Sequence, residues 1–190
     1  MIKKWSDISG WCNSANLYEE IVNLAEDNSI FVEIGAWLGM STALMATLIK
    51  KSNKKIVFYT IDTFEGSASY PPQIDYVKEN GGNIFHLFYK NLQELDLLNY
   101  MNPIIQNSFD AIKFIPKEID FLFIDGDHKY EFIFNELNLY WPLIKKGGII
   151  SGDDINHNDV EKATKDFFSK ISLSVQIHNV DKNCWYVKKL

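Results

Sequence analysis

The sequence predicts an α/β fold: a doubly wound, mostly parallel β-sheet with helices on both faces and an antiparallel last strand. Short, continuously apolar segments alternate with longer segments of helical period, which is typical of parallel strands joined by helices. Several of the apolar segments end in glycine or acids. The last two strand-like segments are separated by only four residues. The length of 190 residues indicates a single domain, residues 1–190.

The apolar segments define the expected strands in order. Residues 30–34 are short, rich in β-branched side chains and followed by Gly35, so they predict a buried strand. By the same criteria, further strands are expected at 55–62, 104–106, 119–125 and 147–152. Helices are expected at 41–50, 83–95, 108–115, 130–143 and 159–169. The first of these begins near Ser41 or Thr42, and Pro116 ends the third.

The end of the chain departs from this alternation. Residues 173–178 and 183–187 are strand-like, and the gap between them is too short for a helical crossover. The two strands are therefore expected to be antiparallel.

One connection is long, from residue 65 to residue 103. Its first part, residues 66–82, contains Pro71-Pro72 and Gly81-Gly82 and is expected to be an ordered loop. Long loops in compact domains are usually functional or disordered, and Tyr70 and Tyr76 offer packing surfaces. We therefore expect residues 65–103 to form a lid over a substrate.

The composition limits the partners. A net charge of −6 and a pI near 5.2 argue against a nucleic-acid partner, which requires a basic face. The sequence contains no recognisable signal peptide and no apolar run long enough to cross a membrane. Cys12 and Cys184 have no metal-type spacing and favour reduced thiols in a cytoplasmic protein. A homo-oligomer stays open, with Trp5 and Trp11 as an expected exposed contact surface.

The first strand leads into the motif VEIGAWLGMST, residues 32–42. Gly35 allows a sharp turn, Gly39 allows close backbone approach, and the following helix offers free N–H groups to an anionic ligand. The glycine spacing differs from the dinucleotide pattern, which argues against a nicotinamide oxidoreductase. It suits S-adenosylmethionine, which has an amino-acid end and no pyrophosphate. Asp62, at the end of the second strand, can accept hydrogen bonds from ribose hydroxyls or cap the next turn.

Acids follow the fourth and fifth strands. Asp125 and Asp127 leave one, and Asp153 and Asp154 leave the other. Since neighbouring strands lie about 4.8 Å apart, these carboxylates are expected in one small volume, where a hard divalent cation would relieve their repulsion. Asp125, Asp153 and Asp154 are the predicted ligands of Mg²⁺ or another divalent cation. The alternative is that these acids cap turns and helices.

His128 lies one residue beyond Asp127, where a substrate is expected. Its ordinary pKa suits a general base, and Asp127 is the rival candidate for that role. His157 is a weaker candidate for substrate contact.

Together these residues resemble the class I S-adenosylmethionine-dependent methyltransferases, most closely the small-molecule O-methyltransferases of the methyltransferase 24 type. The matching segments are FVEIGAWLGMSTALMA, IDTFEGS, IIQNSF, IDFLFIDGDHKYE, WPLIKKGGIISGDD and NDVEKATKDFF. The resemblance implies a Rossmann-like, seven-stranded sheet with the last strand antiparallel. It implies that Glu33 and Gly35 lie near the methionine moiety, Asp62 near the ribose and Ser108 near the adenine. The full set of expected cofactor-binding residues is Glu33, Gly35, Ala36, Trp37, Gly39, Ser41, Thr42, Asp62, Thr63, Ser108, Phe109 and Asp125.

The resemblance also implies methyl transfer to the hydroxyl of a small molecule, with metal use in many members. Ile155 departs from the pattern, because an aromatic residue commonly follows the paired acids. Two alternatives stay open: a metal-independent methyltransferase of the same fold, and a non-catalytic S-adenosylmethionine-binding protein.

Overall fold

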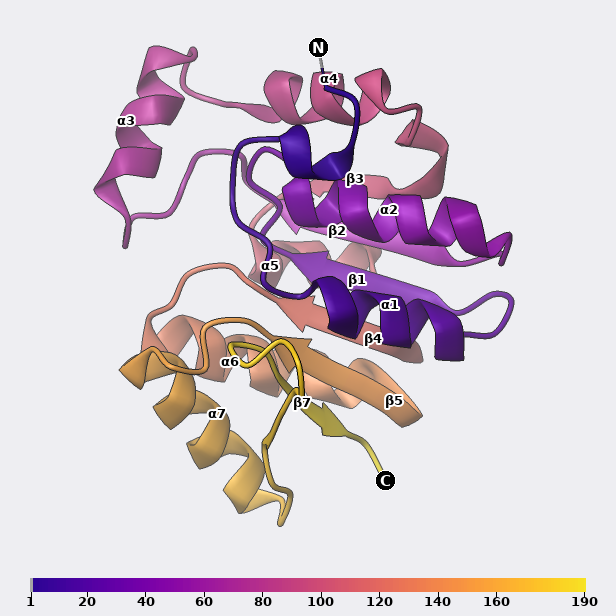
Figure 1. The fold of residues 1–190 in the computed structure, drawn as a ribbon. Helices are drawn as coiled ribbons and strands as arrows, with labels where there is room; N and C mark the ends of the chain where they lie inside the picture. The colour runs from indigo at the N-terminus through magenta and orange to yellow at the C-terminus, as the bar shows by residue number, and fades with distance from the viewer. Residues whose placement is uncertain (1) are drawn as a thin grey trace.

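The computed structural model describes residues 2–190 and contains one seven-stranded sheet (Figure 1). The strand order is β3-β2-β1-β4-β5-β7-β6. The first five strands are parallel, and β7 runs antiparallel to both of its neighbours. The strands are β1 Ile30–Ile34, β2 Val57–Asp62, β3 Asn102–Ile105, β4 Ile119–Ile124, β5 Ile144–Gly152, β6 Gln176–Ile177 and β7 Trp185–Lys188. The predicted mostly parallel sheet with an antiparallel end is confirmed.

Helices cover both faces of the sheet. The α-helices are α1 Ala15–Leu24, α2 Met40–Ser52, α3 Pro71–Glu79, α4 Phe85–Glu94, α5 Ser108–Ala111, α6 Tyr130–Tyr140 and α7 Asn158–Lys170. Short 3-10 turns occur at Trp5–Asp7, Leu98–Tyr100, Ile112–Phe114 and Trp141–Leu143. Helices α1, α2 and α4 pack on one face, whereas α5, α6 and α7 pack on the other.

The central strands supply both cores because successive side chains of a strand point to opposite faces. In β4, Phe121 and Phe123 join the core under α1 and α2, whereas Leu122 and Ile124 join the core under α6 and α7. This double burial explains why the strand is a continuous apolar run in the sequence.

Residues 66–82 differ from the expected loop, because they include helix α3. Pro71 and Pro72 occupy its first turn, where the missing N–H groups would have no helical partner. The helix ends at Glu79, and Gly81 and Gly82 lie just beyond its cap with positive φ angles of 94° and 85°, which suit a chain leaving a helix. In Figure 1, α3 stands apart from the two helical layers, on the side to which the parallel strands point.

Several smaller expectations can be compared with the structure. Strands β6 and β7 pair antiparallel, as expected, although β6 has only two residues. Cys12 and Cys184 are free thiols. Trp11 is 59% exposed, but the expectation that Trp5 is exposed is wrong, because it packs partly buried against the core. Among the described residues, no helix has the length and apolar character needed to cross a bilayer.

Candidate active site at the carboxyl edge of the sheet

The predicted glycine loop and the predicted acid cluster meet where β1 and β4 lie side by side. The chain leaves these neighbouring strands toward opposite faces of the sheet, and such a switch point is where ligands bind in α/β sheets. Gly35 has a φ of +93°, and a Cβ there would lie 2.0 Å from the carbonyl oxygen of Asp125. Only glycine lets the two motifs pack this closely.

Asp62 shapes the glycine loop. Its Oδ2 accepts hydrogen bonds from the backbone N–H groups of Ala36 and Trp37, both at 2.8 Å, and its Oδ1 accepts one from Phe64 at 2.7 Å. Trp37 has a left-handed φ of 49°, which these bonds help to hold. The carboxylate therefore lies beside the loop and stabilises the loop's conformation, and its bond to Phe64 caps the following turn. Thr63 follows it and accepts a bond from the Glu65 N–H.

Glu33 lies beneath the loop and is only 1% exposed. Its carboxylate accepts hydrogen bonds from Tyr18, Thr42 and Thr60, which tie α1, α2 and β2 to β1. Burial raises the pKa of this carboxyl, and the hydroxyl donors oppose that rise. Ser41 and Thr42 are also buried, so these predicted cofactor residues support the loop from inside.

A buried acid that the sequence analysis missed lies beside Ser108. Glu136 is 3% exposed and accepts a 2.6 Å bond from the Ser108 hydroxyl, while the Tyr140 hydroxyl donates to the Ser108 carbonyl. The other oxygen of Glu136 has no partner among the described residues. Burial raises the pKa of Glu136 to about 7. The sequence did contain a signal for Glu136, because it shares the buried face of α6 with apolar residues at helical spacing. An acid on such a face needs a hydrogen-bond partner.

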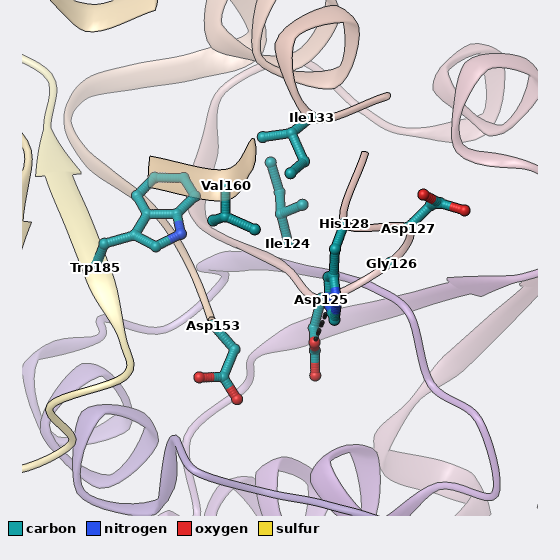
Figure 2. Close-up of a pocket in the computed structure, with 9 residues that line it drawn as sticks. All are labelled: Ile124, Asp125, Gly126, Asp127, His128, Ile133, Asp153, Val160 and Trp185. Carbon is teal, nitrogen blue, oxygen red and sulfur yellow. Dashed lines mark ion pairs between the residues drawn. The ribbon is translucent and has the colours of Figure 1, made fainter. Parts of the chain in front are cut away.

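The acids bring three potential metal ligands together. One ligand atom each of Asp125, His128 and Asp154 lies within 4.8 Å of the others. The Nε2 of His128 is 3.7 Å from Asp125 Oδ1 and 3.2 Å from Asp154 Oδ2. Figure 2 shows the His128 ring against the Asp125 carboxylate. Asp154 has a left-handed φ of 56°, and His157 lies near His128, with 5.7 Å between ring centroids.

The surroundings of Asp125 and His128 shift the pKa values of both side chains. Burial raises the pKa of Asp125 to about 7, against the opposing effect of His128. The nearby carboxylate of Asp125 raises the pKa of His128. Behind the group, a cavity of about 10 Å³ is lined by Ile124, Val160 and Trp185 among others, enough for about one water. This apolar wall explains the desolvation.

The other two acids are bound to neighbouring segments. Asp153 accepts a 2.9 Å bond from the Asn13 side chain and a 2.8 Å bond from the Asp154 N–H. Asp127 accepts bonds from Ser69 at 2.7 Å and Ser67 at 3.2 Å, and Figure 2 shows its carboxylate directed away from the His128–Asp125 pair. Burial raises the pKa of Asp127, but these bonds outweigh burial and lower it overall.

This arrangement defines a class of protein: an α/β protein whose glycine loop and carboxylate–histidine group share the switch point of a seven-stranded sheet. The family model described as a methyltransferase domain matches residues 32–155. The chain therefore belongs to this family of methyltransferase domains.

A relative and several solved structures are similar to this chain. A protein of Acanthamoeba polyphaga mimivirus, described as uncharacterized, is 34% identical over 143 residues, which cover 75% of this chain and 56% of the relative. The chain thus spans little more than half of that relative. The O-methyltransferase NovP has a TM-score of 0.72 at 17% identity, covering 93% of this chain and 79% of its own. An O-methyltransferase from Bacillus cereus in complex with SAH has a TM-score of 0.64 at 15% identity, covering 95% and 83%. At these identities, the structural matches concern the fold.

Proposed function

We propose that the protein transfers the methyl group of S-adenosylmethionine to a hydroxyl of a small molecule. The observation that carries this proposal is the packing of Gly35 against Asp125, which joins the glycine loop to the carboxylate–histidine group. A cofactor on the loop and an acceptor on the acids would then be neighbours. The O-methyltransferase NovP and the SAH-bound neighbour support the choice of oxygen acceptor and cofactor.

The cofactor side fits this ligand. Helix α2 begins after Gly39 and offers free backbone N–H groups to a carboxylate. Asp62 keeps acceptor capacity beyond its three backbone donors, since a carboxylate has about four lone-pair sites, and can take a ribose hydroxyl. Ser108 and the 36% exposed Phe109 are the proposed adenine contacts.

On the acceptor side, the proposed role of the residues is to accept the proton of the acceptor hydroxyl. The sulfonium of the cofactor supplies an electrophilic methyl group, and the acceptor oxygen must approach it in line. His128 is the proposed base for the hydroxyl proton. Asp125 and Asp154 stabilise the imidazolium that results, because both carboxylates lie near its Nε2.

We also propose a divalent cation beside this group, held by Asp125 and Asp154 of the group and by the neighbouring Asp153. Asp125, Asp153 and Asp154 are the proposed ligands of Mg²⁺ or a similar ion, and Asp153 retains a lone pair beyond its three hydrogen bonds. A cation there would lower the pKa of a coordinated hydroxyl. A metal-independent enzyme is the second candidate, because a protonated His128 lies close enough to Asp125 and Asp154 to compensate their charge.

Two measurements test these assignments. Calorimetric titration with SAH should show binding to the wild type, and Asp62→Ala should weaken it at least tenfold, whereas Glu19→Gln, on the exposed face of α1, should not. Unchanged binding in Asp62→Ala contradicts the cofactor assignment.

The metal is tested separately. Once an acceptor is known, excess EDTA should abolish methyl transfer, and Mg²⁺ should restore it. Full activity after confirmed metal removal supports the metal-independent candidate instead.

A further inference from the structure

We propose that Trp11 and Tyr70 form an aromatic roof over the acceptor and select a ring-shaped acceptor, and that Asp127 positions this roof and is not the catalytic base. Here "roof" means residues 10–13 and 67–70 together. The inference rests on the proposed function, because it assigns the acceptor side of the same site.

The first half of the roof is a strap from the N-terminal region. At one end Gly10 contacts the glycine loop, since a Cβ there would lie 3.4 Å from Trp37 and 3.7 Å from Met40. At the other end Asn13 donates to Asp153 after β5, and the Cys184 thiol donates to the Asn13 carbonyl. Because β4 lies between β1 and β5, the strap crosses the end of β4, where the His128 group begins. Three extended residues span roughly 10 Å, about two strand spacings.

The second half follows β2. Ser67 and Ser69 donate hydrogen bonds to Asp127 beyond β4, so this segment crosses the end of β1, which lies between them. The segment is stiffened by α3, whose Gln73 side chain accepts from the Ser67 N–H at 2.9 Å. Asp127 thus accepts three hydrogen bonds, because its Oδ1 also accepts one from the Lys129 N–H.

The two halves meet through their aromatic rings. Trp11 and Tyr70 touch edge to face, with centroids 6.0 Å apart and planes at 81°. A second contact joins Trp37 of the glycine loop to Tyr76 of α3, with centroids 5.5 Å apart. Trp11 remains 59% exposed and Tyr70 46% exposed, so both rings keep free surface beside the site.

This geometry has a chemical preference. Free aromatic faces bind flat rings by stacking and bind the C–H face of saturated rings, whereas a small open-chain alcohol gains little from them. The acceptors that we expect therefore have one feature in common, a six-membered ring that carries the reacting hydroxyl. Phenols and pyranose sugars are the two classes of compound with such a ring.

The first experiment measures binding to the wild-type protein saturated with SAH and Mg²⁺. The probes are catechol, methyl α-D-mannopyranoside and propane-1,2-diol, which is a vicinal diol without a ring. We expect one of the ring probes to bind more tightly than the open-chain diol. Trp11→Ala and Tyr70→Ala should each weaken it roughly two- to tenfold. Phe114→Ala, which removes a 56% exposed ring elsewhere, should have no effect.

The outcomes separate the two proposals. If SAH does not bind the wild type, the proposed function fails. If SAH binds but neither ring probe binds better than the open-chain diol, the roof proposal is overturned. Ring binding that Trp11→Ala and Tyr70→Ala leave unchanged also overturns it. Binding of catechol alone identifies a phenol, and binding of the mannoside alone identifies a sugar.

The second experiment tests Asp127 as a positioning residue. The double variant Ser67→Ala/Ser69→Ala should raise the rate of backbone hydrogen exchange in residues 66–82. It should also weaken binding of the ring probe as much as Asp127→Asn does. The affinity for SAH should be unchanged in both variants. Ser69→Thr keeps the hydroxyl and should restore wild-type behaviour. Unchanged exchange in the serine double variant overturns the positioning role. So does a loss of ring-probe binding that occurs in Asp127→Asn alone.

Discussion

The cofactor side and the acceptor side of the site are built in different ways. On the cofactor side, backbone groups define the shape: Gly35 packs against the Asp125 carbonyl, and Asp62 accepts bonds from three backbone N–H groups. On the acceptor side, side chains define it: Asn13 reaches Asp153, and Ser69 reaches Asp127. A surface held by side chains can change its specificity by substitution, whereas one made of backbone cannot change without altering the fold.

The largest expected effect lies on the cofactor side, at Gly35. Gly35→Ala should destabilise the protein by roughly 3–5 kcal/mol, because its Cβ would collide with backbone atoms of Asp125 and its φ is +93°. Gly147→Ala is the matched control, since its φ is +81° but no atom lies within 4 Å. The control should lose only about 1 kcal/mol. If chemical denaturation shows the same loss of stability in both variants, the close packing of Gly35 against Asp125 does not contribute to stability.

The next effect concerns Glu136, also on the cofactor side. Its folded pKa of about 7 exceeds the ordinary 4.5, so the folded protein binds the extra proton, and stability falls as pH rises from about 4.5 to 7. Glu136→Gln removes this dependence. As pH rises from 5 to 8, the free energy of unfolding of the variant should increase relative to that of the wild type by up to about 3 kcal/mol. Glu131→Gln, on the exposed part of the same helix, should not. A wild type with pH-independent stability would contradict the buried acid.

The smallest effect is expected on the acceptor side. Asn13→Ala removes one hydrogen bond to Asp153 and should cost about 1 kcal/mol in thermal denaturation. SAH affinity should not change. A large loss of SAH affinity would break the comparison, because the strap would then belong to the cofactor side as well.

Local patterns in the sequence were sufficient for much of the site. The periods of the strands and helices follow from burial on one or two faces. Gly35 and Asp125 directly follow strands and Asp62 ends one, and the carboxyl ends of these strands share one edge. The expected loop at 66–82 was wrong because Pro71-Pro72, read as a breaker, also begins helices. Glu136 was missed because its partner Ser108 is 28 residues away.

The sequence by itself determined the mostly parallel sheet, its antiparallel last strand, and the motifs at its edge, because each depends on residues close together in the chain. Only the tertiary structure decided how the acids divide. His128 lies with Asp125 and Asp154, whereas Asp127 and Asp153 are bound by Ser69 and Asn13. Those partners lie 58 and 140 residues away in the sequence. A carboxylate turns toward whichever donor the fold brings near, and no local pattern encodes that choice.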